Sequence, residues 1–347
     1  MLDIKLRQIL INDYKGINYL DINFPMPDRS GDPDVIVLGS ENGLGKTAVL
    51  ECCALSLFLL KVLDTRETSQ TDSDHFNLIV RAGKPQAMIT GTLSNGTEIG
   101  VRIRNHAVYG AIRSSQTNDS AEKKVIVFRR DGLTGLRTKS KDTIRKILGH
   151  DPNPVIEQNF LFFHEYRKNL EGNPRARTLF GDTVRDTAIS TFKRTALLLK
   201  MHTAGLFETS NDQNSQELLD KLDDLLKLYA ACRFAKLQQT ESGGLELRVQ
   251  PIDGGDAFNF DGLSSGQKEI ITTLFLIWYE TRNTSKVVLI DEPELHLNSQ
   301  WHRDFIHSLN KLAPQNQYII ATHSATIMDS VSRDRRILLQ QDEEVFQ

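Results

Sequence analysis

Lys286 to Asn298, with the sequence KVVLIDEPELHLN, is the stretch that most restricts what this chain can fold into. Val287 to Ile290 are four consecutive apolar residues, which predicts a short strand buried on both faces. The acids Asp291 and Glu292 follow at once, and Pro293 cannot continue the ladder of hydrogen bonds. Open α/β sheets bind ligands beyond the carboxyl ends of such strands. A strand that ends in a solvated acidic turn is the alternative interpretation.

A second short strand, Val35 to Leu38, runs directly into the glycine-rich segment GSENGLGKT, residues 39–47. The strongly apolar sequence AVLECCALSLFLLKVL follows and indicates a helix. Strand, glycine-rich loop, Lys-Thr and helix together bind phosphate groups through backbone N–H groups and the helix N-terminus. In this arrangement Lys46 reaches the outer phosphates and the Thr47 hydroxyl binds Mg²⁺. Asp291 and Glu292 would then differ in role, one near hydrated Mg²⁺ and one polarising an attacking water.

The glycine-rich loop departs at one position from the pattern GxxxxGK[ST]. Strict spacing requires a glycine at position 40, where the chain has Ser40, and Gly39 stands one residue early. Gly43 and Gly45, which permit close approach of the backbone, are in register. Either the small Ser40 makes the entry turn or the loop carries one extra residue. A flexible glycine turn without a ligand is the alternative.

The sequence LSSGQ at residues 263–267 predicts a second anion site. Ser264 or Ser265 is a natural N-cap, and an apolar helix follows Gly266. A Ser-Gly helix start of this kind has no phosphate loop of its own. An anion site at this helix start has a purpose if it reaches the ligand bound by the phosphate loop of a second copy of the chain.

Two further side chains are candidates for the same site. His323 lies 32 residues after Asp291 (323 − 291), at the end of an apolar strand from Tyr318 to Ala321, so a neighbouring strand could bring its imidazole to the outer phosphate. Gln158, beside a predicted strand in NPVIEQNFLFFHE, is a candidate for contacting Mg²⁺. A structural histidine and a surface glutamine are the respective alternatives.

The rest of the chain predicts an antiparallel layer and a helical insert. Residues 86–104 form a hairpin around Asn95-Gly96, and residues 2–24 resemble another. Residues 186–201 and 216–238 are predicted helices, the second too short for a long coiled-coil arm. Basic residues are frequent between Lys123 and Lys146, where a solvated face and a nucleic-acid face both remain open.

Composition excludes several classes of protein. Lys and Arg number 42 against 45 Asp and Glu, so the net charge of −3 excludes a polycation, and nucleic acid could bind only at a local patch. Three cysteines cannot build a disulfide framework. There is no basic-then-apolar leader and no apolar run that could span a bilayer. We expect a cytoplasmic protein without a membrane partner.

Lys46, Ser264 in LSSGQ, Asp291-Glu292 and His323, in this order, resemble the ABC-type ATPase heads of the RecF, SMC and OLD (overcoming lysogenization defect) group. The resemblance covers nearly the whole chain except about residues 167–241. It implies an α/β fold with a mixed sheet around the phosphate-loop helix, an antiparallel β layer and a helical subdomain. The expected boundaries are 1–166 for the N-terminal part of the head, 167–245 for the helical subdomain and 246–347 for the C-terminal part of the head.

The resemblance also implies a homodimer or higher homo-oligomer that holds ATP and Mg²⁺ between its heads. Glu292 would activate water and His323 would contact the γ-phosphate, while Mg²⁺ would be ordered by Thr47, Gln158 and Asp291. The residues expected to bind nucleotide are Lys15, Ser40, Asn42, Gly43, Gly45, Lys46, Thr47, Ala48, Ser264, Gly266, Gln267 and Asn298.

Three functions are compatible with such a head. The first is a regulatory ATPase that controls a separate nuclease or toxin in bacterial antiphage defence. The second is a RecF-like ATP-dependent repair protein that binds DNA. The third, an ATPase subunit of a transporter, is disfavoured by the ELHLN sequence and the antiparallel layer.

Overall fold

The computed structural model describes residues 4–29, 31–40, 45–65, 79–104, 107–113, 123–127, 138–149, 153–165, 188–203, 212–239, 245–295 and 297–339. The chain forms two units. Residues 1–166, 283–294 and 302–347 form the head unit, and residues 167–282 and 295–301 form the helical unit. The boundary expected after residue 245 therefore differs from the structure, because residues 246–282 belong to the helical unit.

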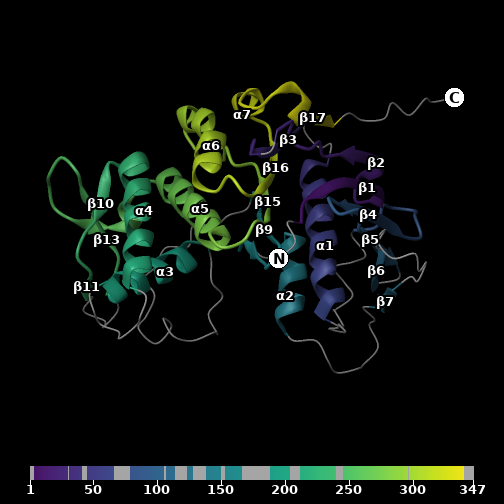
Figure 1. Ribbon diagram of the computed structural model, residues 1–347, viewed down its shortest axis with the longest axis horizontal. Helices are drawn as coiled ribbons and strands as arrows, with labels where there is room; N and C mark the ends of the chain where they lie inside the picture. The colour runs from purple at the N-terminus through teal and green to yellow at the C-terminus, as the bar shows by residue number, and fades with distance from the viewer. Residues whose placement is uncertain are drawn as a thin grey trace. The chain divides into compact units, whose positions relative to one another are not determined.

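A six-stranded, mainly parallel sheet is the centre of the head unit (Figure 1). The order of its strands is β17 (Arg336–Leu339), β3 (Asp34–Ser40), β16 (Gln317–Thr322), β15 (Val287–Asp291), β9 (Phe160–Phe163) and β8 (Val155–Ile156). All neighbours pair in parallel except β8, which is antiparallel to β9. Every residue of β15 and β16 is buried, which explains the unbroken apolar runs.

The predicted antiparallel layer is a second six-stranded sheet of the head unit. Its order is β2 (Ile17–Asn23), β1 (Leu6–Tyr14), β4 (Ala87–Leu93), β5 (Glu98–Arg104), β6 (Ala107–Arg113) and β7 (Lys123–Val127). The hairpin predicted around Asn95-Gly96 is confirmed by the pairing of β4 with β5, and Gly96 adopts φ 78°, which favours glycine.

The helix α1 (Lys46–Thr65) lies between the two sheets, as Figure 1 shows. Its residues Leu50, Leu57 and Phe58 are buried in one hydrophobic cluster that also contains Ile9 of β1 and Leu289 of β15. A helix covered on both sides needs apolar residues around its whole circumference, which accounts for its apolar sequence. The head unit also contains α2 (Thr138–Ile147), α7 (Ala325–Asp329) and the 3₁₀ turn η4 (Arg333–Arg335).

The helical unit is built around three helices: α3 (Ala188–Thr203), α4 (Asp212–Ala230) and α5 (Ser265–Thr281). Phe192 of α3 packs against Phe275 of α5, with ring centroids 5.4 Å apart. This contact places α5 in the helical unit. Short strands and one 3₁₀ turn complete the unit: β10 (Cys232–Phe234), β11 (Gln238–Gln239), β12 (Leu245–Glu246), β13 (Arg248–Pro251), β14 (Phe258–Asn259) and η3 (Phe260–Gly262).

The helix predicted over residues 216–238 is partly wrong, because α4 ends at Ala230. Ala231 adopts a left-handed φ of 49°, and the chain continues as β10, in which Cys232 and Phe234 alternate with an exposed residue. A separate helix, α6 (Ser299–Leu312), begins in residues of the helical unit and continues in residues of the head unit. Among the described residues, no helix is both long and apolar enough for a membrane span.

Candidate nucleotide site

The carboxyl ends of three parallel strands meet at one edge of the central sheet. Thr322 of β16 pairs with Gly39 of β3, and Asp291 of β15 pairs with Ala321 of β16. The phosphate-loop strand, the acidic pair and the strand before His323 therefore end side by side. This is the edge at which open α/β sheets bind ligands.

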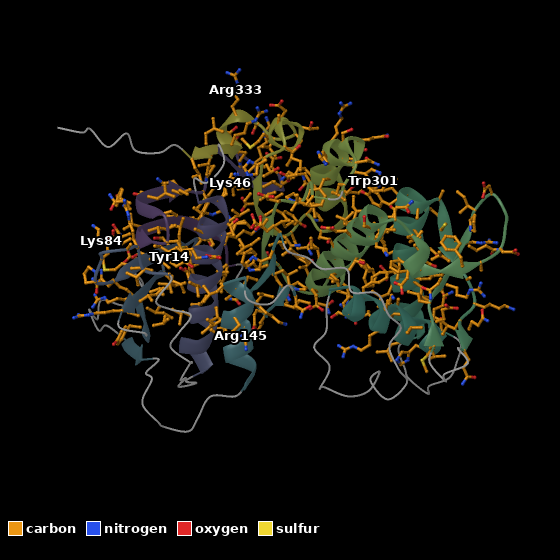
Figure 2. All side chains as sticks on the ribbon, turned by 180° about the vertical axis from the view of Figure 1, so that it is seen from behind. Tyr14, Lys46, Lys84, Arg145, Trp301 and Arg333 are labelled. Atoms are coloured by element: carbon orange, nitrogen blue, oxygen red, sulfur yellow. The ribbon has the colours of Figure 1, made fainter. Side chains whose placement is uncertain are left out.

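Lys46 is the first residue of α1 and is only 5% exposed (Figure 2). Burial lowers the pKa of its ammonium group, and the carboxylates of Glu292 and Asp291 oppose that shift. Gly45 adopts φ +84°, and a Cβ there would lie 3.1 Å from Ile17, so glycine is required immediately before the helix. Ala48, in the first turn, is buried.

The structure assigns Gly39 to packing rather than to the entry turn of the loop. Gly39 and Ser40 are the last residues of β3, so the strand is longer than predicted. A Cβ at Gly39 would lie 2.9 Å from Cε of Met328 and 3.2 Å from Leu338. The proposed nucleotide contacts of Asn42 and Gly43 lie outside the described residues, and the Ser40 side chain is likewise not described.

The Thr47 hydroxyl donates a hydrogen bond to Oδ2 of Asp291 at 2.8 Å. Asp291 is fully buried at the end of β15. A hydroxyl and a carboxylate are hard oxygen ligands of the kind that Mg²⁺ prefers. Among the described residues, no group of three or more His, Cys, Asp or Glu could hold a metal. The Thr47 hydroxyl and the Asp291 carboxylate fit an Mg²⁺ ion that takes its remaining ligands from phosphate and water.

Glu292 and His323 lie within contact distance of each other. Nε2 of His323 is 3.2 Å from Oε1 of Glu292 and 2.8 Å from Nζ of Lys46. Glu292 adopts a left-handed φ of 45°, and its N–H donates to the Ala321 carbonyl at 2.8 Å. Non-glycine residues rarely adopt this conformation, and such strain is concentrated at functional sites. Burial, with a further contribution from Glu165, raises the pKa of Glu292.

The structure does not bring Gln158 to this edge. Gln158 lies in the turn between β8 and β9, and β9 runs parallel to β15 with Phe160 opposite Val287. It is therefore at the amino end of the strands, whereas Asp291 is at the carboxyl end. The assignment of Gln158 to Mg²⁺ is wrong because the strand begins after this residue rather than before it.

Glu165, which sequence reasoning missed, lies at the correct end of β9. Phe163 pairs with Ile290, so Glu165 follows its strand at the level of Glu292. After burial, its charge is the next cause that raises the pKa of Glu292, and it opposes the lowering of the pKa of Lys46 by burial. The signal was present in the sequence, because FLFFHE places an acid after a buried apolar run in the same way as VVLIDE does.

Lys15 lies beside α1 but contacts an acid. Its Nζ is 2.6 Å from Oε1 of Glu51, and the Tyr14 hydroxyl donates to the other carboxylate oxygen at 2.9 Å. Burial raises the pKa of Glu51. Glu51 lies one helical turn after Thr47, so the Lys15 ammonium lies near the start of α1. Its contact with nucleotide stays a prediction.

In the helical unit, Ser264 is the N-cap of α5. Its side chain accepts from the Gln267 N–H at 3.2 Å, and the Gln267 side chain accepts from the Ser264 N–H at 3.0 Å. This capping box settles which of the two serines caps the helix. Ser264 is exposed and Gly266 is buried. The amide oxygen of Gln267 is used in the cap, so its predicted contact with nucleotide would be made by the amide nitrogen.

A buried lysine holds the turn that precedes this cap. Nζ of Lys193, whose side chain is fully buried, lies 2.5 and 2.7 Å from the two carboxylate oxygens of Asp261. Nζ of Lys268 donates to the Asp261 carbonyl at 3.0 Å. The start of α5 therefore rests on a rigid turn. Elsewhere in the same unit, Oδ1 of Asn298 accepts from the Trp301 N–H at 2.9 Å and thereby fixes the start of α6.

The chain resembles known proteins in sequence and in fold. Residues 41–329 match the family described as "AAA domain, putative AbiEii toxin, Type IV TA system". The retron Vc95 probable ATPase of Vibrio cholerae serotype O1 biovar El Tor is 28% identical over 99 residues. That match covers 26% of this chain and 19% of the retron protein, so the chain spans about a fifth of this relative.

Two solved structures show the same fold along the chain. An Smc head bound to the C-winged helix domain of ScpA has a TM-score of 0.53 and 16% identity, covering 95% of this chain and 96% of that one. An Smc head with an extended coiled coil, bound to the C-terminal domain of ScpA derived from Pyrococcus furiosus, has a TM-score of 0.51 and 15% identity, covering 94% and 92%. The expected fold of an ABC ATPase head is confirmed.

Proposed function

Because the chain belongs to the family described as AAA domain, putative AbiEii toxin, Type IV TA system, and has the fold of an ABC ATPase head, we propose that it binds and hydrolyses ATP between two copies of itself. The observation that supports this proposal best is the convergence of five side chains at one edge of the central sheet: Lys46, Thr47, Asp291, Glu292 and His323.

Each of these side chains has a role that its position supports. The Lys46 ammonium binds the outer phosphates, because it is held by the first turn of α1 and faces the sheet edge. Thr47 and Asp291 hold Mg²⁺, which neutralises phosphate charge when bound. Glu292, whose pKa is raised, accepts a proton from the attacking water. His323 contacts the γ-phosphate.

The start of α5 completes the site from a second copy. Ser264 is exposed at the N-terminus of α5, a 17-residue helix, and the phosphate loop belongs to the other unit of the chain. Ser264 and the backbone N–H of Gly266 would donate to the γ-phosphate of the partner copy, with Asn298 nearby. Hydrogen bonds to a charged group contribute about 1.5–3 kcal/mol each. Loss of the γ-phosphate therefore weakens the dimer strongly, and hydrolysis acts as a switch.

We further propose that this switch controls a separate nuclease or toxin in bacterial antiphage defence. The family description, which names a toxin of a type IV TA system, and the retron ATPase relative support a role beside another component. We therefore favour control of a separate effector protein over a role in DNA repair. Hydrolysis that DNA stimulates, with a steep dependence on salt, would instead identify a RecF-like repair protein.

Size-exclusion chromatography of three proteins tests the proposal. With Mg²⁺ and ATP, Glu292→Gln should bind ATP without turnover and elute as a larger species than wild type. Lys46→Ala should bind no ATP and elute unchanged, which provides the matched control. If Glu292→Gln hydrolyses ATP at the wild-type rate, or if Lys46→Ala binds ATP with unchanged affinity, the catalytic site does not lie at this edge of the sheet.

A further inference from the structure

Glu294 is a side chain at the same sheet edge that the mechanism above leaves without a role. Its carboxylate accepts hydrogen bonds from three donors of one loop. The Thr322 hydroxyl donates at 2.7 Å, the His323 N–H at 2.5 Å and the Ser324 N–H at 3.2 Å. The segment that carries the acidic pair is thereby tied to the loop that carries His323.

The two carboxylate oxygens divide these donors between them. Oε1 accepts both backbone N–H groups, and Oε2 accepts the Thr322 hydroxyl. The Ser324 N–H also reaches Oγ1 of Thr322 at 2.9 Å. Hydrogen bonds to a carboxylate are shorter and stronger than those between neutral groups. The loop from Thr322 to Ser324 is therefore fixed by its backbone as well as by side chains.

The other end of this loop is also fixed. Oγ of Ser324 accepts from the Ile327 N–H at 3.3 Å and so caps α7. Nδ1 of His302, on α6, lies 3.2 Å from the same oxygen. Between these anchors, the His323 side chain is 35% exposed, so close packing alone does not determine where its imidazole points.

We propose that Glu294 is a positioning residue for hydrolysis, which holds the backbone of His323 so that its imidazole faces Lys46 and Glu292. The proposal rests on the proposed ATPase function and assigns to Glu294 no contact with nucleotide. An imidazole on a loosened loop would spend less time in the reactive geometry. Hydrolysis would slow, while Lys46 and Thr47 would still bind ATP.

Two substitutions of Glu294 distinguish the role of its hydrogen bonds from the role of its negative charge. In Glu294→Gln, the amide oxygen can accept both backbone N–H groups, and the amide nitrogen can donate to Oγ1 of Thr322. The loop therefore stays in place without the negative charge. In Glu294→Ala, both acceptor oxygens and with them all three hydrogen bonds are lost. The two variants at one position form a matched pair.

Steady-state hydrolysis and ATP binding of the full chain test the proposal. Glu294→Ala should lower kcat by about 10- to 100-fold, as expected for a small misplacement of a reacting group. Its ATP affinity should stay close to that of wild type. Glu294→Gln should retain most of the wild-type kcat. His323→Ala should lower kcat similarly, and the double variant with Glu294→Ala should lose little more, because both changes remove one function.

Other results would overturn the proposal. Wild-type kcat in Glu294→Ala would show that the loop does not need this anchor. An equal loss in Glu294→Gln would assign the effect to charge, and additive losses with His323→Ala would assign it to a separate role. If Glu294→Ala does not fold, Thr322→Val removes one donor from a buried site and should give a smaller fall in kcat, whereas wild-type kcat would contradict the proposal. The proposed function itself is tested separately: absence of turnover in wild type, normal ATP binding by Lys46→Ala, or wild-type turnover by Glu292→Gln would contradict it whatever Glu294→Ala does.

Discussion

The hydroxyl of Thr47 and the carboxylate of Asp291 are 2.8 Å apart, although 244 positions separate them in the chain. Octahedral Mg²⁺ binds oxygen ligands at about 2.0–2.1 Å, which places neighbouring ligand oxygens about 3 Å apart. The two oxygens therefore already have the separation that shared coordination of one ion or its water shell requires. Folding brings the two oxygens together, because Asp291 at the end of β15 is fully buried and Thr47 at the start of α1 is half-buried between Lys46 and Ala48, which are both buried.

Asp291→Asn tests this arrangement, because it preserves the shape of the side chain and removes its charge. Affinity for ATP in the presence of Mg²⁺ should fall by about tenfold or more. The interaction of the Asp291 charge with the ion is expected to contribute about 1.4 kcal/mol or more, and about 1.4 kcal/mol corresponds to a tenfold change. Affinity in the presence of a chelator should change little, because Lys46 still binds the phosphates. Titration with a fluorescent ATP analogue measures both. An equal loss under both conditions would show that Asp291 supports the fold rather than the ion.

Glu165 should raise the pH at which the proposed ATPase activity appears. Burial and then the charge of Glu165 raise the pKa of Glu292 above its usual 4.5. Glu292 must be deprotonated to accept a proton, so kcat/KM should be low in acid and rise as pH passes that raised pKa. Glu165→Gln removes one of the two main causes and should move this rise to lower pH. Burial remains, so the pKa should not return fully to 4.5.

The pH profile of kcat/KM measures this effect, because it reports the pKa values of the free enzyme. Glu98→Gln, which changes a half-exposed acid on the antiparallel sheet that lies 3.6 Å from Nη1 of Arg113, is a matched control that should leave the profile in place. An unmoved profile in Glu165→Gln would separate Glu165 from the reaction, even if its overall rate changes.

The success of the sequence interpretation depended on the length of each apolar run. Asp291 and His323 follow runs long enough to be recognised as buried strands, and parallel strand ends meet at one edge, so their positions were predictable. Gln158 is misplaced because the sequence analysis treats NPVIEQNFLFFHE as one strand with a loop, whereas the segment forms the two-residue strand β8, a turn that contains Gln158, and then β9. The same interpretation leaves Glu165, which follows β9, without a role, although FLFFHE has the same pattern as VVLIDE.

Contacts made by distant side chains could not be predicted at all. The interaction of Lys193 with Asp261 joins residues that are 68 positions apart, and no local pattern distinguishes Lys193 from a surface lysine of α3. The α5 helix is expected in the head because the resemblance to ABC-type heads implies that boundary, and its packing against Phe192, which places it in the helical unit, has no local signal.

Ser264→Arg should separate nucleotide binding from assembly. Ser264 caps α5 and is exposed, so a long cation at this position can be accommodated in one copy but would obstruct the approach of a second nucleotide site. We expect ATP affinity to remain near that of wild type in dilute protein, and the ATP-dependent shift in size-exclusion chromatography to disappear, in both cases with Glu292→Gln as background. Ser265→Arg, one residue into the helix, shows whether the effect is specific to the cap. Persistent assembly in Ser264→Arg would mean that this helix start does not reach the partner copy.

Lys193→Met should destabilise the helical unit because it leaves the Asp261 carboxylate without its closest cation. Methionine preserves most of the apolar stem, so the fully buried side chain still fills its site. Removing one partner of a buried ion pair typically costs 3–5 kcal/mol, and we expect about 2–3 kcal/mol here because Asp261 is 19% exposed. Urea unfolding followed by circular dichroism measures the change. Adding Asp261→Asn should recover part of the lost stability, since no unpaired charge then remains.

Lys200→Met on the same helix is the control. It removes a cation 5.7 Å from the Phe234 ring and should lower the free energy of unfolding by no more than about 1 kcal/mol. Equal losses at the two lysines would show that the pair with Asp261 contributes nothing specific to the turn that carries Ser264.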